Sequence, residues 1–452
     1  MNKTLHLVSL GCPKNLVDAE VMLAALEADG FQTVAEPEAA DILLVNTCGF
    51  IQSAAEEAID VILELAAHKQ ADPRKKLVVT GCLVQRHGAD LAASLPEVDC
   101  FVGLDDFPNI ARLLARRESA ARAGTRQGLF SRPGSASYLM DSAVSRRLAT
   151  PFFRAYLKIT EGCDNRCAYC MIPAIRGPLR SRTIPDLATE ARRLADRGVR
   201  ELSLIAQDLT AFGRDLCLTN GLPRLLERLL AETAIPWLRL LYLYPSAVDD
   251  ELLSLMRAEP RITPYLDVPM QHVSDAVLAA MGRRYRRADL EAFLERTRRF
   301  LPDCALRTTF MVGFPGETEA QFEELLTAIR SWRLHHVGVF AYEDEEEAPA
   351  AKLPGKLPQE EKEARRDAAM SAQAEVSAAL SQEQVGRVLP VLVEGYSRES
   401  DLLLEGRAPF QAPEVDGCVY INDGQAERGE IVPVRVTEAH VYDLVGEVAT
   451  GD

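Results

Sequence analysis

Strand-like and helix-like hydrophobic patterns alternate along the first hundred residues of the chain. Three apolar runs predict strands, at residues 4–10, 41–47 and 77–80. Between them, apolar residues recur at spacings of three and four over residues 16–26 and 51–65, which predicts two amphipathic helices. Strands that alternate with helices indicate a parallel α/β sheet.

The same alternation resumes at residue 154 and continues through six strand–helix units. Strands are expected at residues 154–160, 200–206, 237–243, 263–268, 304–311 and 336–341. Six units predict a partial (β/α) barrel rather than a complete barrel of eight. A charged helix at 358–384 then leads to five short strands with Gly, Pro and Asp breaks. These strands, at residues 388–394, 401–404, 417–421, 430–436 and 441–447, predict a small antiparallel β-barrel of the oligonucleotide-binding shape.

A chain of 452 residues is too long for one ordinary core, so several domains are expected. The patterns divide it into an N-terminal α/β domain at 1–118, a central partial barrel at 151–383 and a C-terminal barrel at 384–452. Residues 119–150, where Ala, Arg, Gly and Ser dominate and periodicity fades, are predicted to be a linker.

Charge and hydropathy narrow the class of protein. The net charge of −16 disfavours non-specific nucleic-acid binding, which needs Lys and Arg for phosphate contacts. The N-terminal apolar run is too short for a signal peptide, and no later window approaches the roughly 18 apolar residues that span a membrane. We therefore expect a soluble, cytoplasmic protein without a membrane partner. In that compartment, grouped cysteines more often indicate metal or redox chemistry than disulfides.

Three of the ten cysteines form the most specific pattern in the chain. Cys163, Cys167 and Cys170 lie at spacings of four and three directly after a predicted strand. Three thiolates can hold three irons of a [4Fe–4S] cluster and leave the fourth iron open to S-adenosylmethionine (SAM). Tyr169, just before the third cysteine, suits packing against adenine. A zinc site or three buried core cysteines are the alternatives, but zinc usually takes four ligands in paired spacing.

A second group of cysteines is related only through the predicted fold. Cys12, Cys48 and Cys82 each follow the carboxyl end of a predicted parallel strand, where open α/β sheets bind their ligands. They could therefore share a second metal site, although a single such cysteine is more often a small buried hydrophobe. The remaining four cysteines show no grouping and are interpreted as structural: Cys100, Cys217, Cys304 and Cys418.

The turn around Gly313 also follows a predicted barrel strand. The segment VGFPGET at 312–318 lies where a barrel carries its chemistry, so Gly313 is a candidate SAM contact. A structural turn that opens a helix is an equally good interpretation. Gln207 and Asp208 end another predicted strand. Two interpretations are open for them: they line the barrel cavity, or they cap the end of the strand. No catalytic acid, base or nucleophile is assigned.

Seven segments together carry a family resemblance. They are SLGCPKNLVDAE at 9–20, NTCGFI at 46–51, TGCL at 80–83, YLKITEGCDNRCAYCMIPAIRGPLRSR at 156–182, LYLYPSAVDDELL at 241–253, LDVPMQH at 266–272 and MVGFPGET at 311–318. They resemble the methylthiotransferases over nearly the whole chain. The resemblance implies a radical-SAM barrel between an N-terminal methylthiotransferase domain and a C-terminal TRAM domain. It also implies two [4Fe–4S] clusters, an auxiliary one on Cys12, Cys48 and Cys82 and the radical-SAM one on Cys163, Cys167 and Cys170.

Two branches of that family differ in substrate. One modifies an adenosine of tRNA, and the other inserts a methylthio group at the β-carbon of an aspartate in the small-subunit ribosomal protein S-twelve. The segments GCPKNLVD, IRGPLRSR and LDVPMQHVSD resemble the second branch. Residues 386–452 hold five arginines and no lysine against thirteen acidic residues, a net charge of −8, which suits a basic protein and makes tRNA an unlikely partner. The acidic run EDEEE at 343–347 departs from the family pattern, a change that is expected to affect a loop at the barrel mouth without touching the clusters.

The resemblance implies a reaction that uses two SAM molecules, one as methyl source and one as radical source. A radical cofactor suits this reaction because the aspartate β-carbon is unactivated. An external electron donor and a sulfur donor are implied as further partners. The alternatives are a tRNA adenosine methylthiotransferase and a non-enzymatic iron–sulfur module that binds the ribosome. The acidic tail disfavours the first, and the SAM-type cysteine spacing disfavours the second.

Overall fold

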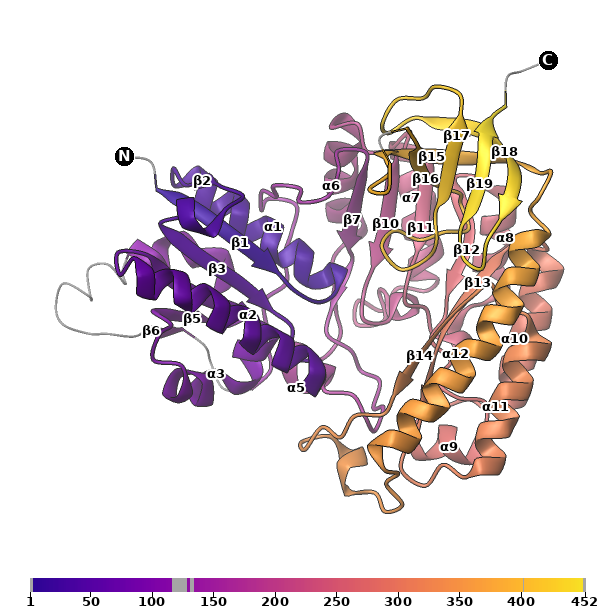
Figure 1. The fold of residues 1–452 in the computed structure, drawn as a ribbon, viewed down its shortest axis with the longest axis horizontal. Coiled ribbons are helices and arrows are strands. Elements are labelled where there is room, and N and C mark those ends of the chain that lie inside the picture. Colours follow the sequence, from indigo (N-terminus) through magenta and orange to yellow (C-terminus); the bar gives the residue numbers. More distant parts are fainter. Residues whose placement is uncertain (1–2, 116–127, 131–133, 401, 450–452) are drawn as a thin grey trace.

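The computed structural model contains two parallel sheets and one closed barrel (Figure 1). It describes residues 3–115, 128–130, 134–400 and 402–449. The N-terminal sheet lies beside the central barrel, and the C-terminal barrel packs on one end of the central one. In the described part of the chain, no helix has the length and apolar character needed to cross a membrane.

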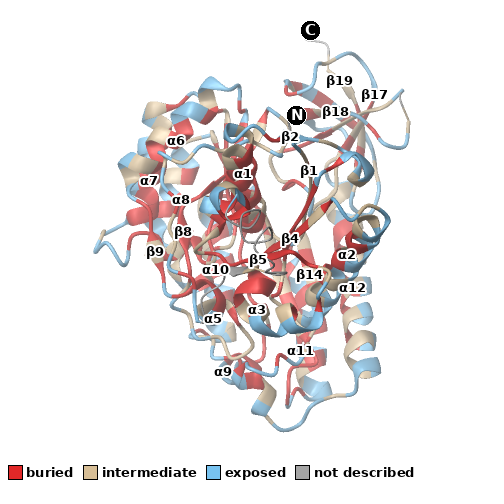
Figure 2. Ribbon diagram, turned by 90° about the vertical axis from the view of Figure 1, so that its left-hand side faces the viewer, coloured by how far each residue is buried: buried red, intermediate tan, exposed pale blue. Residues whose placement is uncertain are grey.

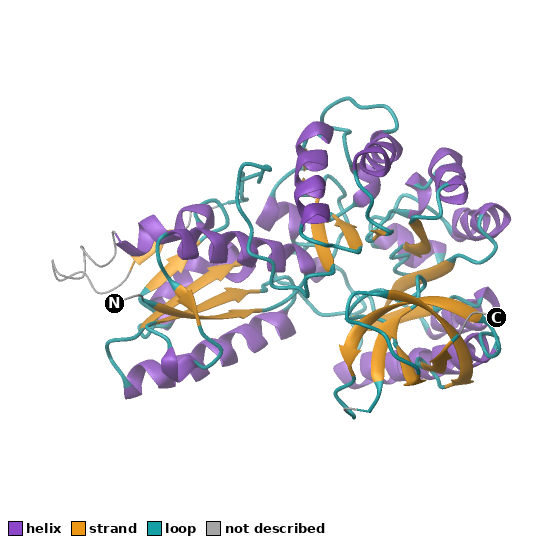
Figure 3. Cartoon of the chain, turned by 90° about the horizontal axis from the view of Figure 1, so that it is seen from above, coloured by secondary structure: helices purple, strands orange, loops and turns teal. Residues whose placement is uncertain are grey.

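The N-terminal sheet has six parallel strands in the order β2-β1-β3-β4-β5-β6. The strands are β1 (Thr4–Ser9), β2 (Gln32–Thr33), β3 (Ile42–Thr47), β4 (Lys76–Gly81), β5 (Cys100–Val102) and β6 (Gly128–Phe130). Helices α1 (Pro13–Ala28), α2 (Gln52–Ala71) and α3 (Cys82–Ser94) cover its two faces (Figure 3). All six residues of β3 are buried because both faces are covered, which explains why this strand is a continuous apolar run.

The central sheet is an open barrel of six parallel strands in the order β14-β13-β12-β11-β10-β7. The strands are β7 (Arg154–Lys158), β10 (Glu201–Ile205), β11 (Trp237–Leu240), β12 (Ile262–Asp267), β13 (Ala305–Val312) and β14 (His336–Ala341). Each of the six predicted strands is confirmed to within a few residues. The connecting helices are α6 (Ile184–Asp196), α7 (Gly221–Glu232), α8 (Asp250–Ala258), α9 (Asp275–Ala280), α10 (Arg287–Phe300) and α11 (Glu319–Trp332).

Local sequence features begin these helices where the barrel needs them. Thr183 accepts a hydrogen bond from the backbone of Asp186 at the start of α6, and Thr318 forms a capping box with Gln321 at the start of α11. The buried residues of the molecule follow the strands, whereas the surface helices show exposed stripes (Figure 2). A short pair, β8 (Thr160–Glu161) and β9 (Arg180–Ser181), frames the cysteine loop and helix α5 (Ile172–Arg176) at the mouth of the barrel, where its strands end.

The C-terminal domain is a closed five-stranded barrel in the order β15-β16-β17-β19-β18. Its strands are β15 (Val388–Tyr396), β16 (Leu404–Arg407), β17 (Val419–Asp423), β18 (Ile431–Ala439) and β19 (Leu444–Val448). The prediction of an entirely antiparallel barrel is wrong in one respect, because β17 and β19 pair in parallel. Helix α12 (Gln359–Gln382) connects this domain to the central barrel.

The segment predicted to be a linker has a different role where it is described. Residues 128–130 form β6 and extend the N-terminal sheet by pairing with β5. From residue 134 the chain then runs along α1 and the barrel, and the guanidinium of Arg146 pairs there with Glu20 and Glu190. Residues 119–127 and 131–133 of the predicted linker lie outside the described part.

A buried ionic contact holds the C-terminal domain against the floor of the central barrel, meaning the end where its strands begin. Glu201 accepts hydrogen bonds from Arg239 of the barrel (2.6 Å) and from Arg407 of the C-terminal domain. Asp416 accepts a hydrogen bond from the Tyr265 hydroxyl (2.7 Å) and lies 3.4 Å from the Arg307 guanidinium. The C-terminal domain is therefore fixed against the floor of the barrel.

Candidate functional site

The three N-terminal cysteines lie at the carboxyl edge of the N-terminal sheet, as predicted. Cys12 precedes α1 after the end of β1, Cys48 directly follows β3, and Cys82 is the first residue of α3 after β4. Cys12 acts electrostatically on Cys48, and both act on Cys82, so the structure brings the three thiols together. Cys82 is buried, whereas Cys12 and Cys48 are partly exposed.

Glycines allow the three loops to meet so closely. A Cβ atom on Gly11 would lie 2.8 Å from the Cβ of Cys48, and one on Gly49 would lie 2.6 Å from the Cα of Leu83. A Cβ on Gly81 would lie 2.4 Å from the Thr47 carbonyl oxygen. Gly11 and Gly81 also have positive φ angles, of 87° and 104°, which side chains disfavour. Any larger residue would push the loops, and their thiols, apart.

The environments of these thiols differ. Burial favours the neutral form of Cys12, but the charges of Lys14 and Arg176 outweigh it and lower the pKa of that thiol. Burial raises the pKa of Cys48, and raises that of Cys82 to about 11. Cations therefore stabilise a thiolate at Cys12 before any metal is bound.

The second set of cysteines lies on the loop between β8 and α5. Gly162 begins this loop with a φ of 73°, and a Cβ there would lie 2.1 Å from the Pro178 carbonyl oxygen. The Asn165 amide donates to the Cys163 sulfur (3.4 Å), and the Arg283 guanidinium donates to the Cys167 sulfur (3.4 Å). N–H donors directed at cysteine sulfurs are a common feature of iron–sulfur sites.

Tyr169 and the turn after β13 pack in one small hydrophobic cluster. Tyr169 packs against a buried group that includes Phe314 and Tyr342, and burial raises its pKa. The Gly313 amide donates to Glu317 (2.9 Å), and a Cβ on Gly313 would lie 2.3 Å from Lys362 of α12. These contacts favour a structural turn at Gly313, and its contact with SAM remains a prediction.

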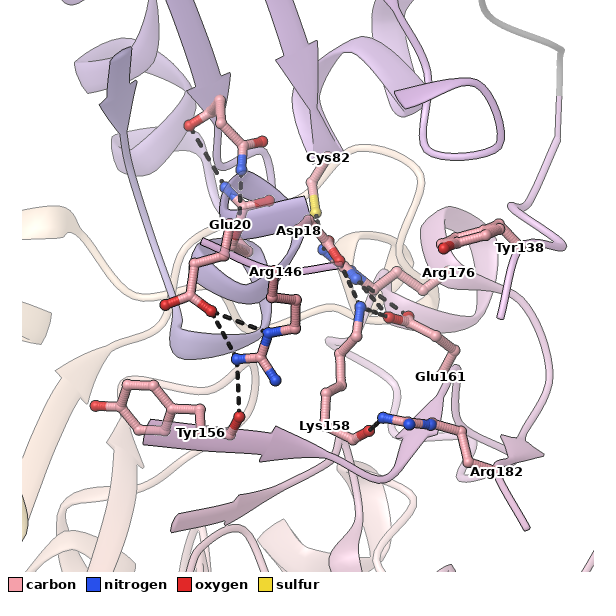
Figure 4. Close-up of polar contacts among 12 residues, drawn as sticks. Asp18, Glu20, Cys82, Tyr138, Arg146, Tyr156, Lys158, Glu161, Arg176 and Arg182 are labelled. Atoms are coloured by element: carbon pink, nitrogen blue, oxygen red, sulfur yellow. Dashed lines mark hydrogen bonds and ion pairs between the residues drawn. The ribbon is translucent and has the colours of Figure 1, made fainter. Parts of the chain in front are cut away.

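Four buried charges lie at the interface between the N-terminal domain and the barrel, beside Cys82 (Figure 4). We call them the mouth ion cluster: Asp18 of α1, Lys158 of β7, Glu161 of β8 and Arg176 of α5. Arg176 donates to Asp18 (2.9 Å) and Glu161 (3.1 Å), and Lys158 pairs with the same two carboxylates. Arg176 also donates to the Cys82 sulfur at 3.4 Å, so a residue of the helix that follows the second cysteine loop touches a thiol of the first set.

The charges of this cluster support one another. Burial opposes ionisation of Glu161, but Lys158 and Arg176 outweigh it and hold the pKa of that carboxyl well below its ordinary value. None of the four residues is more than 4% exposed. A buried arrangement with two positive and two negative charges fixes the N-terminal domain over the barrel mouth.

The acidic run at 343–347 has a role that the sequence did not predict. It follows β14 and contacts the N-terminal domain, where Glu343 accepts hydrogen bonds from the Ser53 amide (3.0 Å) and hydroxyl (2.8 Å). Arg86 of α3 pairs with Glu345 (2.6 Å) and Glu347 (2.9 Å). Residues 343–347 therefore form a contact between domains, which we call the acidic clasp.

The donor sets suit clusters better than single ions. Within the described residues, no group of three or more His, Cys, Asp or Glu side chains is arranged around one metal ion. In a cluster each thiolate binds a different iron, so the sulfurs do not have to converge on a single point. Three thiols in each set, with N–H donors at Cys82, Cys163 and Cys167, therefore fit [4Fe–4S] groups.

Sequence reasoning missed the charged residues that surround the thiols. Lys14, Asp18 and Glu20 are buried on α1, which gives that helix an unusually polar buried face. Buried charges are rare unless they are paired. Three charged residues within one apolar helix pattern could therefore have indicated that ion pairs lie near these thiols. Gln207, which the sequence did single out, has a buried side-chain amide without a hydrogen-bond partner in the described structure.

An open parallel barrel with a three-cysteine loop at its mouth defines the class of radical-SAM enzymes. Residues 157–329 match the family model of the radical SAM superfamily, residues 4–103 match the uncharacterized protein family UPF0004, and residues 385–449 match the TRAM domain. Membership of the superfamily implies SAM and one [4Fe–4S] cluster as cofactors.

Curated relatives match over nearly the whole chain. The chain is 54% identical over 445 residues to the ribosomal protein uS12 methylthiotransferase RimO of Desulfotalea psychrophila, covering 98% of this chain and 99% of the relative. It is 47% identical to the protein of that name from Syntrophotalea carbinolica, covering 99% and 97%. The chain therefore belongs to the RimO family of methylthiotransferases.

Solved structures support the fold. The radical SAM methyltransferase TsrM from Kitasatospora setae, solved with cobalamin and a [4Fe–4S] cluster bound, superimposes with a TM-score of 0.57 at 16% identity. The match covers 77% of each chain.

Proposed function

We propose that this chain inserts a methylthio group at the β-carbon of an aspartate in ribosomal protein uS12, the S-twelve protein of the small subunit. We further propose that it carries two [4Fe–4S] clusters. Cys163, Cys167 and Cys170 would hold the SAM-binding cluster, and Cys12, Cys48 and Cys82 the auxiliary one. The presence of two thiol triplets on the two sides of one domain interface carries this proposal, and Arg176 of the helix that follows the second triplet donates to Cys82 across that interface.

The chemistry of the SAM-bound cluster explains why this reaction uses a radical. A SAM-bound [4Fe–4S] cluster supplies a 5′-deoxyadenosyl radical, which can remove hydrogen from an unactivated carbon. The chain's own residues would orient the participants, because the mouth ion cluster fixes the N-terminal domain, with its thiol triplet, over the mouth of the barrel. A small displacement of the target side chain from the radical would prevent productive reaction, so a rigid interface between the two domains would serve catalysis. External donors supply the electrons and the sulfur.

Separate loss of each triplet tests the assignment. Anaerobic reconstitution of the wild-type chain should give about eight irons, and replacement of either triplet by Ala should give about four. The Cys163/Cys167/Cys170 variant should not cleave SAM. The Cys12/Cys48/Cys82 variant should still release 5′-deoxyadenosine but make no methylthiolated product. Full methylthio insertion by the second variant would contradict an auxiliary cluster at those residues.

Mass spectrometry of both candidate substrates distinguishes uS12 from tRNA. The chain is incubated without oxygen with SAM, a reductant and sulfide, in the presence of ribosomes and tRNA. We expect a methylthio adduct on the uS12 aspartate and none on tRNA. Methylthio-adenosine together with unmodified uS12 would overturn the substrate assignment.

The acidic C-terminal domain provides a second test of the partner. Glu399 is exposed on this domain, and residues 386–452 carry a net charge of −8. Attraction to a basic ribosomal protein should weaken as salt rises, because the Debye length falls to about 8 Å at physiological ionic strength. Reversal of Glu399, Asp401 and Glu405 to Lys should weaken binding of uS12 at low salt. Unchanged affinity would mean that these charges only keep the domain soluble.

A further inference from the structure

Lys14 differs from the other buried cations of this protein. Eight Lys or Arg residues are buried in the described structure: Lys14, Lys75, Lys158, Arg176, Arg182, Arg239, Arg365 and Arg407. Six of them pair with carboxylates, and Lys75 donates to three backbone carbonyls. Lys14 is only 8% exposed, yet within the described residues its ammonium has no carboxylate or carbonyl partner.

The ammonium of Lys14 lies between the two halves of the site. Lys14 follows Cys12 by two residues and belongs to the first turn of α1. Its Nζ lies 3.4 Å from the centre of the Tyr242 ring, which belongs to the barrel and comes just after the end of β11. The groups that act on this ammonium electrostatically come from both domains and include Cys12, Asp267 and Glu161.

Nearby carboxylates are already engaged by other cations. Asp18, one turn further along α1, pairs with Lys158 and Arg176, and Glu161 pairs with the same two residues. Asp267 pairs with Arg307 (3.1 Å) and accepts the Tyr242 amide (3.2 Å). These carboxylates are therefore already paired, and the opposite charge that acts most strongly on Lys14 is the Cys12 thiolate.

Tyr242 is held in a costly conformation beneath this ammonium. Its φ angle is 66°, in the left-handed region that non-glycine residues rarely adopt, and such strain is concentrated at functional sites. A cation over an aromatic face offsets only part of the cost of burying a charge. An anion that enters the mouth would complete the arrangement.

We propose that Lys14 is a positioning residue that receives the side-chain carboxylate of the target aspartate beside Cys12. The inference rests on the proposed function and deepens it by naming the group that would recognise the aspartate. An ion pair there would fix the carboxylate and so place the adjacent β-carbon. It would also distinguish aspartate from asparagine, which has the same shape and no charge.

Binding of two matched peptides tests the inference without relying on turnover. A labelled uS12 peptide containing the target aspartate, and the same peptide with asparagine, are titrated into the cluster-loaded chain. Wild type should prefer the aspartate peptide by about 10-fold or more, as expected for a charge-assisted contact in a desolvated site. Lys14→Met should bind both peptides equally, and Lys14→Arg should keep part of the preference. A Lys14→Met variant that retains the full preference would overturn the inference.

Two further measurements separate the other interpretations. SAM also carries a carboxylate, so a Lys14→Met variant that loses SAM affinity but keeps the peptide preference would assign Lys14 to SAM and overturn the inference. Unfolding measurements separate a structural role, because removing a merely structural cation over Tyr242 would lower stability. Removing an unpaired buried charge should leave stability unchanged or raise it. A clear loss of stability in Lys14→Met, together with an unchanged peptide preference in Lys14→Gln, would likewise contradict the inference.

The outcome for wild type distinguishes this inference from the proposed function. If wild type neither binds nor modifies uS12, the proposed function fails. If wild type modifies uS12 while Lys14→Met still selects aspartate over asparagine, only the role of Lys14 fails.

Discussion

The central barrel meets a neighbouring domain at each of its two ends, and both interfaces contain buried charges. At the floor, Glu201 lies between Arg239 and Arg407, and none of the three touches a cysteine. At the mouth, the ion cluster extends to the Cys82 sulfur through Arg176. The floor charges satisfy one another, whereas those at the mouth reach the proposed metal ligands.

This difference shows that buried ion pairs serve two purposes in the same molecule. A self-contained pair fixes one domain against another, and it is at best weakly stabilising relative to a well-packed apolar contact. A pair that also contacts a thiol links domain position to the metal site. We therefore expect similar losses of stability at both ends of the barrel, but losses of metal only at the mouth.

The largest effect is expected from Arg176→Met. It removes one of two cations from two buried carboxylates, and breaking a buried pair of this kind typically costs about 3–5 kcal/mol. It also removes the donor to Cys82, so the iron at the auxiliary site should fall or its electron paramagnetic resonance spectrum should change. Chemical denaturation and iron analysis measure the two effects.

Arg146→Met is the matched control for that variant. Arg146 pairs with Glu20 and Glu190, its side chain is 4% exposed compared with 3% for Arg176, and in the described structure it donates to no thiol. Its stability should fall by a similar amount, with the iron content unchanged. Equal loss of iron from both variants would mean that the domain position alone, and not the contact with Cys82, holds the metal.

At the floor, Arg407→Met should cost about 3 kcal/mol, because Glu201 keeps Arg239 as one partner. Hydrogen exchange should increase across residues 385–449, where the C-terminal domain is attached. Iron content and release of 5′-deoxyadenosine should match wild type. A loss of iron from this variant would remove the contrast between the two interfaces.

Acid should weaken the floor interface in a defined pH range. Burial opposes ionisation of Glu201, but Arg407 and Arg239 outweigh it and lower its pKa from 4.5 to about 2. The stabilisation from this carboxylate is therefore present above pH 4.5 and is lost as the pH falls toward 2, by up to about 3 kcal/mol. Glu201→Gln should lack this part of the pH dependence of unfolding, so the two curves should converge at low pH. Parallel curves would contradict the assignment.

The smallest effect is expected at the acidic clasp. Glu343→Ala removes two exposed hydrogen bonds to Ser53, and contacts of that kind contribute about 1 kcal/mol or less. Hydrogen exchange at the start of α2 should rise slightly, and more so at low salt than at high salt. A change as large as that of Arg176→Met would mean that the clasp, rather than the buried cluster, holds the domains together.

The parts of the structure predicted from the sequence are those encoded locally. Barrel strands follow from periodicity, and the grouping of Cys163, Cys167 and Cys170 follows from spacing within a few residues, whereas the N-terminal triplet was predicted only through the placement of strand ends. Short strands such as β2 and β5, of two and three residues, are too short for any period to be recognised. The parallel pairing of β17 with β19 is a property of the closed barrel and not of either strand.

Charges at the mouth were missed for a different reason. Asp18 and Arg176 are 158 residues apart, and nothing near either one indicates its partner. The role of the acidic clasp was likewise hidden, because Glu345 meets Arg86 across 259 residues. Even so, Lys14 and Asp18 are unusual in an apolar helix pattern, and their presence could have indicated an interface.

The contact between Arg176 and Cys82 also has a consequence in time. These residues are separated by 94 positions, and translation proceeds at about 5–20 residues per second. The first cysteine triplet therefore leaves the ribosome on the order of ten seconds before the guanidinium that will contact it. During that interval the three thiols lack this contact, and Cys82, directly after the last of the three converging strands, completes the triplet before the barrel has been synthesised.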